Sequence, residues 1–491
     1  MNWNNYPRIV ISGLSGDSGK TVVTCGLLVC FKDGGVNVLG FKKGPDYIDA
    51  AWLSLASDKP AGNLDTYMMG FQKIQNTFLK NACTDGINII EGNRGLFDGV
   101  DSKGTHSTAE LAKILRSPII IVHDISKMTR TAAASIAGCL SLDRDLDIKG
   151  VILNRVAGKR HAMIAKDAIE SETGIPVLGT IPKLSGKFVL PERHLGLITP
   201  DEFEQKEIFL HDARNIILDN VDISRIKDIS INAPSIEYEI PNDDEEIKQA
   251  SSVEIRKRET VPEKVRIGYF KDKSFCFYYP ENIEMLVEAG AELVPVSSTE
   301  SMEPGDIDAL YIGGGFPEMN LADLESNKEM ISEVKRLAEE GLPIYAECGG
   351  LMYLAKDIAW KGRKYSLSGV LPISINMHNK PQGHGYCEMV VDSKNPFYDI
   401  GLVIRGHEFH YSKIYNYDPD IRSSLAVSRG CGCFNGRDGL IYKNVFASYI
   451  HVHALATPEW VSGMIECAHK FRDTKKNIAQ TFYPTFTLAS Q

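Results

Sequence analysis

The chain has 491 residues, of which 43% are apolar and 24% charged, and its formal net charge is −10. Domains usually have about 100–200 residues, so more than one domain is expected. The negative charge argues against a nucleic-acid partner, because phosphate backbones are bound by cationic surfaces. No apolar run approaches the roughly 20 residues that span a bilayer, and the N-terminus has no signal-peptide pattern, so no membrane association is expected.

Alternating short apolar runs and amphipathic stretches occupy roughly the first 200 residues. This alternation predicts an α/β domain with a parallel sheet and helices on both faces. The predicted strands are 8–12, 36–42, 87–91, 117–124, 148–154 and 175–181. The predicted helices include 20–31, 108–116 and 160–173.

A change of composition begins near residue 229, where prolines and the acidic run 243–246 replace the periodic pattern. We predict a first domain over 1–228, a linker over 229–264, a second α/β domain over 265–475, and a C-terminal tail over 476–491. The predicted strands of the second domain include 265–270, 309–312 and 343–346, and its predicted helices include 280–289 and 327–340.

The cysteines indicate a reducing compartment. Ten of them lie between Cys25 and Cys467 without zinc-finger spacing. Cys431 and Cys433 form a single C-x-C pair, with no second pair nearby to complete a metal site. Ordinary reduced cysteines are therefore expected, and with them a cytoplasmic location.

The segment 12–21 lies between a predicted strand and a predicted helix, which is the context of a phosphate-binding loop. Lys20 is expected to contact the phosphates of ATP and Thr21 to bind Mg²⁺. Leu14 stands where the standard motif has its first glycine, so a glycine-rich turn with a chance GKT sequence is the alternative. The loop glycines that we assign to the nucleotide are Gly13, Gly16 and Gly19.

Carboxylates follow two of the predicted strands, in the segments 42–49 and 91–99. Ligands of an open parallel sheet bind beyond the C-terminal ends of its strands, so these carboxylates should face the phosphate loop. Either segment by itself is also compatible with a solvated turn. The metal ligands that we predict are Thr21, Asp46 and Glu91, the last at a Walker B position. The residues predicted to position substrate or ammonia are Lys42, Asp49 and Asp98, and Asn154 is predicted to bind the purine base.

The segment 343–354 predicts a strand, a sharp turn and a helix, with Cys348 at the turn. A thiol there is an exposed nucleophile, and the helix N-terminus should favour its thiolate form. The backbone N–H groups of Gly314, Gly315 and Gly349 are candidates for an oxyanion hole. The residues that could act as base are His407, His410, His451 and His453, among which the sequence alone does not choose.

The motifs together resemble the cobyrinic acid a,c-diamide synthase family. The resemblance covers about residues 8 to 470, through the segments 13–21, 41–49, 63–65, 91–99, 191–196, 277–282, 313–318, 345–354 and 447–451. It implies a dethiobiotin-synthetase-like first domain, which shares the extra residue at Leu14, and a class I glutamine amidotransferase second domain. The family's Ser-Tyr-x-His motif falls on His451, which is the implied base. Other class I enzymes carry a Glu where His453 stands, so the resemblance implies a Cys–His pair without a third member.

The implied reaction is ATP- and Mg²⁺-dependent amidation of the a and c carboxylates of cobyrinic acid, through an acyl phosphate, with ammonia from glutamine. Related enzymes amidate sirohydrochlorin-type macrocycles, including nickel sirohydrochlorin and siroheme, and the motifs do not separate these substrates. Asn93-Arg94 and His106-Ser107-Thr108 are less typical of the family, and the segment 191–196 is a candidate macrocycle contact. A P-loop switch ATPase and a non-catalytic binding protein are the alternatives from other classes. The sequence leaves open whether the chain is a monomer or a homodimer.

Overall fold

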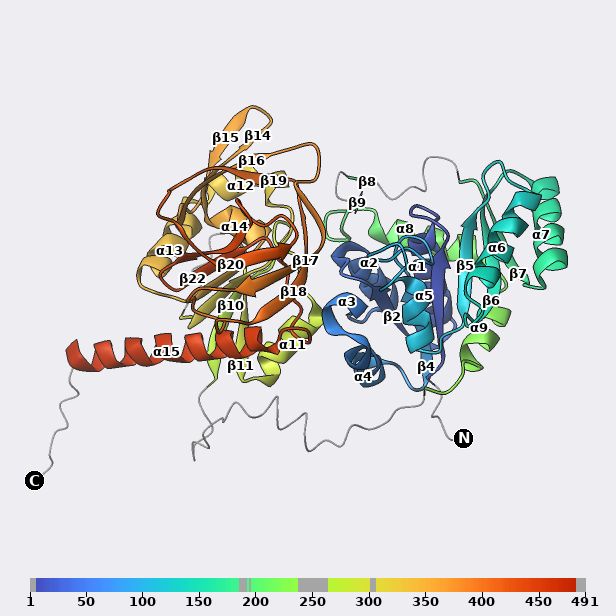
Figure 1. Cartoon of the computed structure of the whole chain (residues 1–491), viewed down its shortest axis with the longest axis horizontal. Helices are drawn as coiled ribbons and strands as arrows, with labels where there is room; N and C mark the ends of the chain where they lie inside the picture. Colours follow the sequence, from blue (N-terminus) through green and yellow to red (C-terminus); the bar gives the residue numbers. More distant parts are fainter. Residues whose placement is uncertain (1–5, 185–191, 194–195, 237–263, 301–305, 483–491) are drawn as a thin grey trace, which may run out of the picture. The chain divides into compact units, whose positions relative to one another are not determined.

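The computed structural model describes residues 6–184, 192–193, 196–236, 264–300 and 306–482. The chain divides into two compact units, Met1–Ile240 and Pro241–Gln491 (Figure 1). Each unit has its own buried apolar core. The predicted α/β class of both halves is confirmed.

The first unit is built on a parallel sheet. Its strands are β1 (Arg8–Gly13), β2 (Asn37–Lys43), β3 (Gly62–Leu64), β4 (Gly86–Glu91), β5 (Ile119–Asp124), β6 (Ile148–Val156) and β7 (Val177–Pro182). They form one seven-stranded sheet in the order β3-β2-β4-β1-β5-β6-β7. Every neighbouring pair is parallel, so all these strands end at the same edge. A separate two-stranded pair joins β8 (Glu192–Arg193) and β9 (Gly196–Leu197).

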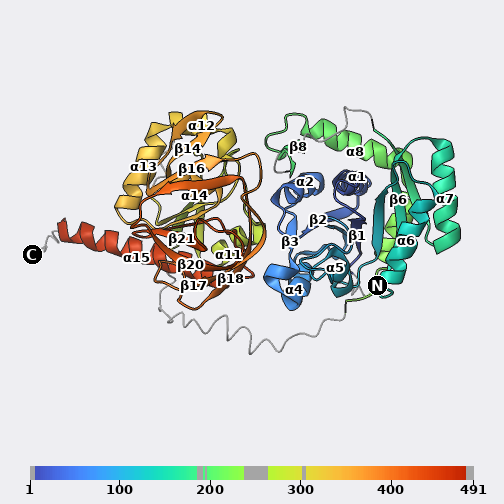
Figure 2. The same cartoon turned by 45° about the horizontal axis from the view of Figure 1, so that its top comes forward.

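Helices cover both faces of this sheet. They are α1 (Lys20–Asp33), α2 (Tyr47–Ser57), α3 (Thr66–Met69), α4 (Phe71–Asn81), α5 (Thr108–Ile114), α6 (Arg130–Leu142), α7 (Lys159–Thr173), α8 (Lys206–Asn220) and α9 (Ile223–Ile231). Figure 2 shows α1, α2 and α8 on one face and α4 and α5 on the other. The central strands β1, β4 and β5 are buried except at Asp124, the last residue of β5, which explains why they are rich in Ile and Val.

The second unit contains a large mixed sheet and a smaller second sheet. The strands of this unit are β10 (Val265–Phe270), β11 (Ala291–Val296), β12 (Ala309–Ile312), β13 (Ile344–Glu347), β14 (Ala355–Trp360), β15 (Arg363–Ser366), β16 (Leu371–Met377), β17 (Gly383–Val391), β18 (Val403–His410), β19 (Ser412–Tyr417), β20 (Arg422–Arg429), β21 (Arg437–Tyr442) and β22 (Val445–Ser448). Nine of them form a sheet in the order β11-β10-β12-β13-β22-β21-β20-β17-β18, and four form a second sheet, β15-β14-β16-β19. The part of the large sheet from β11 to β22 is parallel and the rest antiparallel.

The helices of the second unit lie over two separate cores. They are α11 (Pro280–Glu288), the 3₁₀ helix η1 (Pro317–Met319), α12 (Leu321–Ser326), α13 (Lys328–Glu339), α14 (Gly349–Leu354) and α15 (Pro458–Phe482). Ile344 and Ala346 of β13 belong to the core that contains α12, α13 and α14 residues. Tyr345, which lies between them, belongs to the core that contains α11 and α15 residues. This alternation is what a strand covered on both faces requires.

Two helices extend beyond the domain boundaries that we predicted, one into the predicted linker and one into the predicted tail. The helix α9 continues to Ile231, into the predicted linker 229–264. Beyond α9, the Pro234 carbonyl still accepts a hydrogen bond from Arg8 of β1. The helix α15 runs to Phe482, past the start of the predicted tail at 476. Ile226 and Ser230, four residues apart, form the buried face of α9, so packing continues this helix past the point where the composition changes.

Arg8, at the start of β1, forms hydrogen bonds to segments from the beginning, middle and end of the first unit. It is fully buried. Its guanidinium donates to the carbonyls of Leu115 at 2.7 Å, Tyr6 at 2.8 Å, Arg116 at 3.1 Å and Pro234 at 2.5 Å. Burial, followed by the Arg116 charge, lowers the pKa of Arg8 to about 10, so the side chain stays protonated at neutral pH.

We expect Arg8→Met to destabilise the first unit by about 3 kcal/mol or more, because each buried carbonyl left without a donor costs about 1–3 kcal/mol. The melting temperature of this unit should fall by several degrees, measured by calorimetry. The control is Arg130→Met, whose ion pair with Glu172 is 79% and 47% exposed and should contribute no more than about 1 kcal/mol. Equal melting temperatures of the two variants would contradict the role given to Arg8.

Candidate active sites

The phosphate loop joins the end of β1 to the start of α1, as predicted. Lys20 is the first residue of α1 and its ammonium donates to the Ser15 carbonyl at 3.0 Å, across the loop. Gly19 has φ of +93°, which a glycine adopts without strain. A Cβ on Gly13 would lie 2.2 Å from the Ser18 hydroxyl oxygen, so a larger residue there would displace the Ser18 side chain. A Cβ on Gly16, by contrast, would meet no atom within 4 Å.

Asn154, near the end of β6, forms a hydrogen bond to the backbone of this loop. Its amide nitrogen donates to the Ser18 carbonyl at 2.8 Å, and its amide oxygen accepts from the Arg155 N–H at 2.8 Å. A Cβ on Gly19 would come within 2.3 Å of the same amide nitrogen. Asn154 therefore shapes the phosphate loop directly, in addition to the role toward a purine base that we predicted for it.

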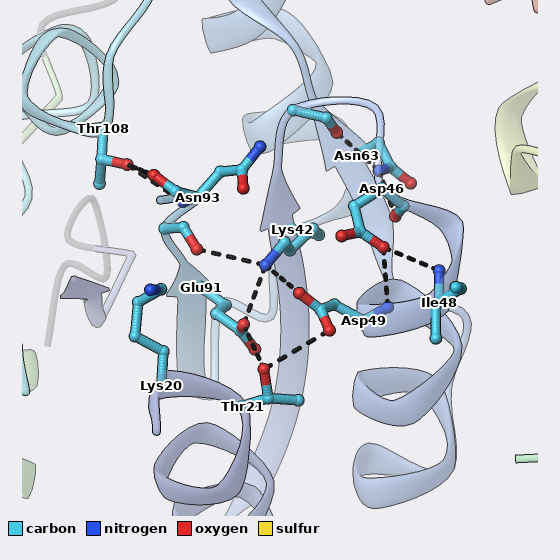
Figure 3. Close-up of polar contacts among 12 residues, drawn as sticks. Lys20, Thr21, Lys42, Asp46, Ile48, Asp49, Asn63, Glu91, Asn93 and Thr108 are labelled. Carbon is cyan, nitrogen blue, oxygen red and sulfur yellow. Dashed lines mark hydrogen bonds and ion pairs between the residues drawn. The ribbon is translucent and has the colours of Figure 1, made fainter. Parts of the chain in front are cut away.

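A buried network of charged groups lies at the ends of β2 and β4, next to the start of α1 (Figure 3). The Lys42 ammonium contacts Asp49 Oδ2 at 2.5 Å and Glu91 Oε1 at 2.9 Å. It also donates to the Gly92 carbonyl at 3.2 Å. The Thr21 hydroxyl donates to Glu91 Oε1 at 2.8 Å and lies 3.5 Å from Asp49 Oδ1. The structure thus brings together four residues that the sequence predicted from three separate segments.

Burial controls the charge of this network. The side chains of Lys42 and Glu91 are 1% and 0% exposed, and that of Asp49 is 16% exposed. Burial raises the pKa of Glu91 to about 7, against the effect of Lys42. Burial also acts to lower the pKa of Lys42, but Asp49 and Glu91 outweigh it and the pKa is raised. In Asp49 burial acts to raise the pKa, and Lys42 outweighs it, so the pKa is lowered. Such costly burial of charge is typical of functional sites.

Two predicted acidic residues have separate structural duties. Asp46 is the N-cap of α2, and its Oδ1 accepts from the N–H groups of Ile48 and Asp49 at 2.9 Å and 3.0 Å. Burial, together with the Asp49 charge, raises the pKa of Asp46 to about 6. Asp98 is exposed, and its Oδ2 accepts from the Gly95 N–H at 2.9 Å, which closes the turn after β4. The metal and positioning roles of Asp46 and Asp98 stay predictions.

The donor set around Thr21 fits a hydrated Mg²⁺ next to ATP. Glu91 Oε2 is a buried carboxylate oxygen with no hydrogen-bond partner among the described residues. The Thr21 hydroxyl lies beside the same carboxylate. Mg²⁺ is usually held by one or two carboxylates together with phosphate oxygens and water, so an all-protein cage is not required. No group of three or more His, Cys, Asp or Glu side chains within the described ranges is arranged to hold a metal alone.

The predicted nucleophile lies on a strained turn between β13 and α14. Cys348 has φ of 46° and ψ of −95°, a conformation that non-glycine residues rarely adopt. Its N–H donates to the Ser448 carbonyl at 2.8 Å and its carbonyl accepts from the Met352 N–H at 3.0 Å. These bonds hold the turn from both sides. Strain of this kind is typical of a nucleophile elbow.

The expected preference for thiolate at Cys348 is wrong for the structure as it stands. Cys348 is buried, and burial, followed by the charge of Glu318, raises the pKa of its thiol. The Gly349 N–H at the helix N-terminus does lower the pKa, as we argued from the sequence, but burial outweighs it. The thiol is therefore protonated at neutral pH, and a base is needed to activate it.

The three predicted oxyanion glycines meet next to Cys348. A Cβ on Gly349 would lie 3.1 Å from the Gly315 nitrogen and 3.4 Å from the Gly314 carbonyl carbon. A Cβ on Gly315, where φ is +154°, would lie 2.1 Å from the Ser274 carbonyl oxygen. A side chain on Gly315 would collide with backbone and one on Gly349 would be tight, so glycines let these two loops approach closely beside Cys348. The oxyanion role of their N–H groups stays a prediction.

The structure separates the four candidate histidines. A Cβ on Gly314 would lie 2.4 Å from His451 Cε1, so the His451 ring packs directly against the oxyanion loop. His407 stacks on His451, with ring centroids 4.8 Å apart. His410 bonds to the Ser412 carbonyl and stacks on a tyrosine. His453 lies with Nε2 3.5 Å from Glu281 Oε2. His451, which the resemblance implied as the base, is thus placed beside the nucleophile's loop.

Two carboxylates near these histidines were missed by the sequence analysis. Glu347 lies at the end of β13, and Glu281 lies in α11. Glu347 had a signal, because it is an acidic residue in an otherwise apolar buried strand, directly before the nucleophile. Glu281 lies in the segment 277–282, which carries part of the family resemblance, but its pairing with a histidine left no local signal, since that histidine is more than a hundred residues away in the chain.

Comparisons with known proteins agree with this geometry. Residues 9–198 match a CobQ/CobB/MinD/ParA nucleotide-binding domain, and residues 266–459 match a CobB/CobQ-like glutamine amidotransferase domain. The cobyrinate a,c-diamide synthase of Magnetococcus marinus is 38% identical over 92% of this chain and 95% of its own length. Those of Caldanaerobacter subterraneus and Archaeoglobus fulgidus are 36% and 37% identical, over 94% and 92% of this chain and 98% and 95% of their own lengths.

The chain belongs to the cobyrinate a,c-diamide synthase family. It is accordingly a glutamine-hydrolysing amidoligase with a nucleotide-binding first unit and an amidotransferase second unit. Of the candidate macrocycle segment 191–196, Pro191, His194 and Leu195 lie outside the described residues. In the described part of the chain, no helix has the length and apolar character that crossing a membrane requires.

We expect Gly314→Ala to lower the glutaminase activity at least about 100-fold, because the added methyl group displaces the His451 ring and a 1 Å misplacement can cost that much. Amidation with ammonium salts should be unchanged, since external ammonia does not need this site. The measurement is glutamate release from glutamine. Gly138→Ala is the control, because a Cβ there meets no atom within 4 Å. Full glutaminase activity in Gly314→Ala would contradict the packing of His451 against the loop.

Proposed function

We propose that this chain is a cobyrinate a,c-diamide synthase, which amidates the a and c carboxylates of cobyrinic acid with ATP and glutamine. The observation that carries the proposal is that one chain holds both a phosphate loop with a buried acidic network and a cysteine elbow packed beside His451. The substrate follows from the names of relatives that match over most of their length. The alternative function, a P-loop switch ATPase, does not require the cysteine elbow.

In the second unit, Cys348 attacks the side-chain amide carbon of glutamine. The thiol starts protonated because its pKa is raised by burial, so His451 takes the proton as the C–S bond forms. The N–H groups of Gly314, Gly315 and Gly349 hold the oxyanion. His451 then gives the proton to the leaving ammonia, and water hydrolyses the γ-glutamyl thioester.

In the first unit, a substrate carboxylate attacks the γ-phosphate of ATP and forms an acyl phosphate, whose phosphate ammonia then displaces. A free carboxylate is a poor electrophile, and phosphorylation gives it a leaving group. Lys20 would contact the phosphates, and Thr21 and Glu91 would hold Mg²⁺, which supplies charge neutralisation when bound. Lys42 keeps Asp49 and Glu91 in place for this purpose. Cytoplasmic location stays a prediction, and the oligomeric state stays open.

The experiment that tests the proposal is mass spectrometry of reactions with ATP, Mg²⁺ and glutamine, with cobyrinic acid, sirohydrochlorin, nickel sirohydrochlorin and siroheme offered side by side. We expect two successive mass decreases in cobyrinic acid, each matching one carboxylate-to-amide exchange. Cys348→Ala should retain this product with ammonium salts and lose it with glutamine. Lys20→Ala should lose it with both. If the mass of only another macrocycle decreases, that macrocycle is the substrate, and the proposed reaction type still holds.

The affinity for MgATP should rise from about pH 6 to about pH 8, because Mg²⁺ binds the Glu91 carboxylate and the pKa of Glu91 is raised to about 7 by burial. At pH 7 binding should release on the order of half a proton per site. Calorimetry in buffers of different ionisation enthalpy measures this release. In Glu91→Gln the proton release and the pH dependence should both disappear. If Glu91→Gln releases as many protons on binding MgATP as the wild type, the protons come from another group and the prediction is wrong.

A further inference from the structure

The carboxylate of Glu347 faces His451. Glu347 is fully buried, and its Oε2 lies 3.7 Å from His451 Nδ1. We propose that Glu347 is a positioning residue of the glutaminase site, which orients the His451 ring and stabilises the imidazolium formed when His451 takes the Cys348 proton. The proposal rests on the roles given to Cys348 and His451 above. It supplies a third member where the family resemblance implied only a Cys–His pair.

Hydrogen bonds hold both oxygens of Glu347 in place. Oε2 accepts from the Tyr311 hydroxyl at 3.0 Å, and Oε1 accepts from the Val452 N–H at 3.2 Å. Tyr311 is itself fully buried. Val452 directly follows His451, so the carboxylate is bonded to the same stretch of backbone that carries the imidazole. A carboxylate held in this way cannot turn away from the ring, which is what orientation of a base requires.

The His451 ring is also held from its other side. His407 and His451 exchange backbone hydrogen bonds, at 2.8 Å from the His451 N–H and 3.3 Å from the His407 N–H. Burial, followed by the His451 and His384 charges, lowers the pKa of His407 well below its usual range. His407 therefore stays neutral and stacks on His451 without adding charge. Glu318, Glu347 and Glu408 act on the Cys348 thiol, raising its pKa, and so increase the need for a stabilised base.

The proton transfer follows from this arrangement. Because Nδ1 of His451 faces Glu347, the other ring nitrogen, Nε2, is the one that takes the thiol proton. The sulfur electron pair forms the bond to the amide carbon, and the imidazolium gains an ion pair with Glu347. The interaction is strong because the pair is buried. A distance of 3.7 Å is long for a hydrogen bond, but catalytic contacts are often loose before substrate binds.

The site contains a matched control. His453, two residues after His451, forms a second buried Glu–His pair, with its Nε2 3.5 Å from Glu281 Oε2. The Leu455 N–H donates to His453 Nδ1 at 3.2 Å, so Nε2 carries the proton of the neutral ring and points it at Glu281. This pair resembles Glu347–His451 in chemistry and burial. It differs in that a Cβ on Gly314 would meet the His451 ring, whereas the three atoms nearest to such a Cβ include none of His453.

The experiment compares Glu347→Gln, Glu347→Asp and Glu281→Gln in the full chain by glutamate release. Loss of the orienting carboxylate should lower kcat by about 10²–10⁴-fold, with KM for glutamine changed only a few-fold. The acidic limb of kcat/KM against pH should move to lower pH, because a negative charge beside the imidazole is lost. Glu347→Asp should recover at least about tenfold in kcat, and Glu281→Gln should stay within about threefold of the wild type. Amidation with ammonium salts should be unchanged in all three.

A Glu347→Gln variant with kcat within about threefold of the wild type and an unmoved pH profile would overturn the proposal. If melting shows that Glu347→Gln is unfolded, Tyr311→Phe takes its place, because it removes one hydrogen bond to Oε2 and keeps the charge. It should lower kcat about tenfold, and wild-type kcat in Tyr311→Phe would overturn the proposal. Failure of the underlying assignment is distinct: Cys348→Ala or His451→Ala would then retain glutaminase activity.

Discussion

Parallel strands that end at one edge of a sheet are the constraint on which both sites depend. In the first unit, β1, β2 and β4 deliver the phosphate loop, Lys42 and Glu91 to the same edge. In the second, β12, β13 and β22 deliver the glycine loop, Cys348 and the segment that leads to His451. Residues that are far apart in the chain meet because their strands are neighbours. The chemistry of each site is thus a consequence of strand order.

Both sites also bury charge, and they resolve its cost differently. In the first, Lys42 lies between Asp49 and Glu91, so two carboxylates share one ammonium, and burial raises the pKa of Glu91 to about 7. The ionised form of Glu91 suits a divalent cation beside Thr21. In the second, Glu347 is satisfied by neutral donors, the Tyr311 hydroxyl and a backbone N–H. In the proposed mechanism this carboxylate stabilises the imidazolium that forms when the facing His451 takes a proton.

Much of this was predictable from the sequence. The phosphate loop, the central strands and the cysteine elbow have local patterns, and the rule about strand ends placed Lys42, Asp49 and Glu91 together. Other features depend on contacts between distant segments, which leave no local signal. The antiparallel strands β17 to β21 were not predicted, because their register is set by pairing across the sheet. The same reason hid Glu281. Cys348 was correctly located, but its pKa depends on burial that only the fold shows.

The hydrogen bond from Arg8 to the Pro234 carbonyl joins the first strand of the first unit to the chain just after its last helix. Ile236, two residues further on, packs against the same core. The independent folding segment therefore ends later than the change in composition indicates. A fragment that stops at residue 228 would cut α9 and remove an acceptor from a buried guanidinium, whereas one that includes residue 236 keeps both. Expression of the nucleotide-binding half by itself, or its exchange between relatives, should respect that later end.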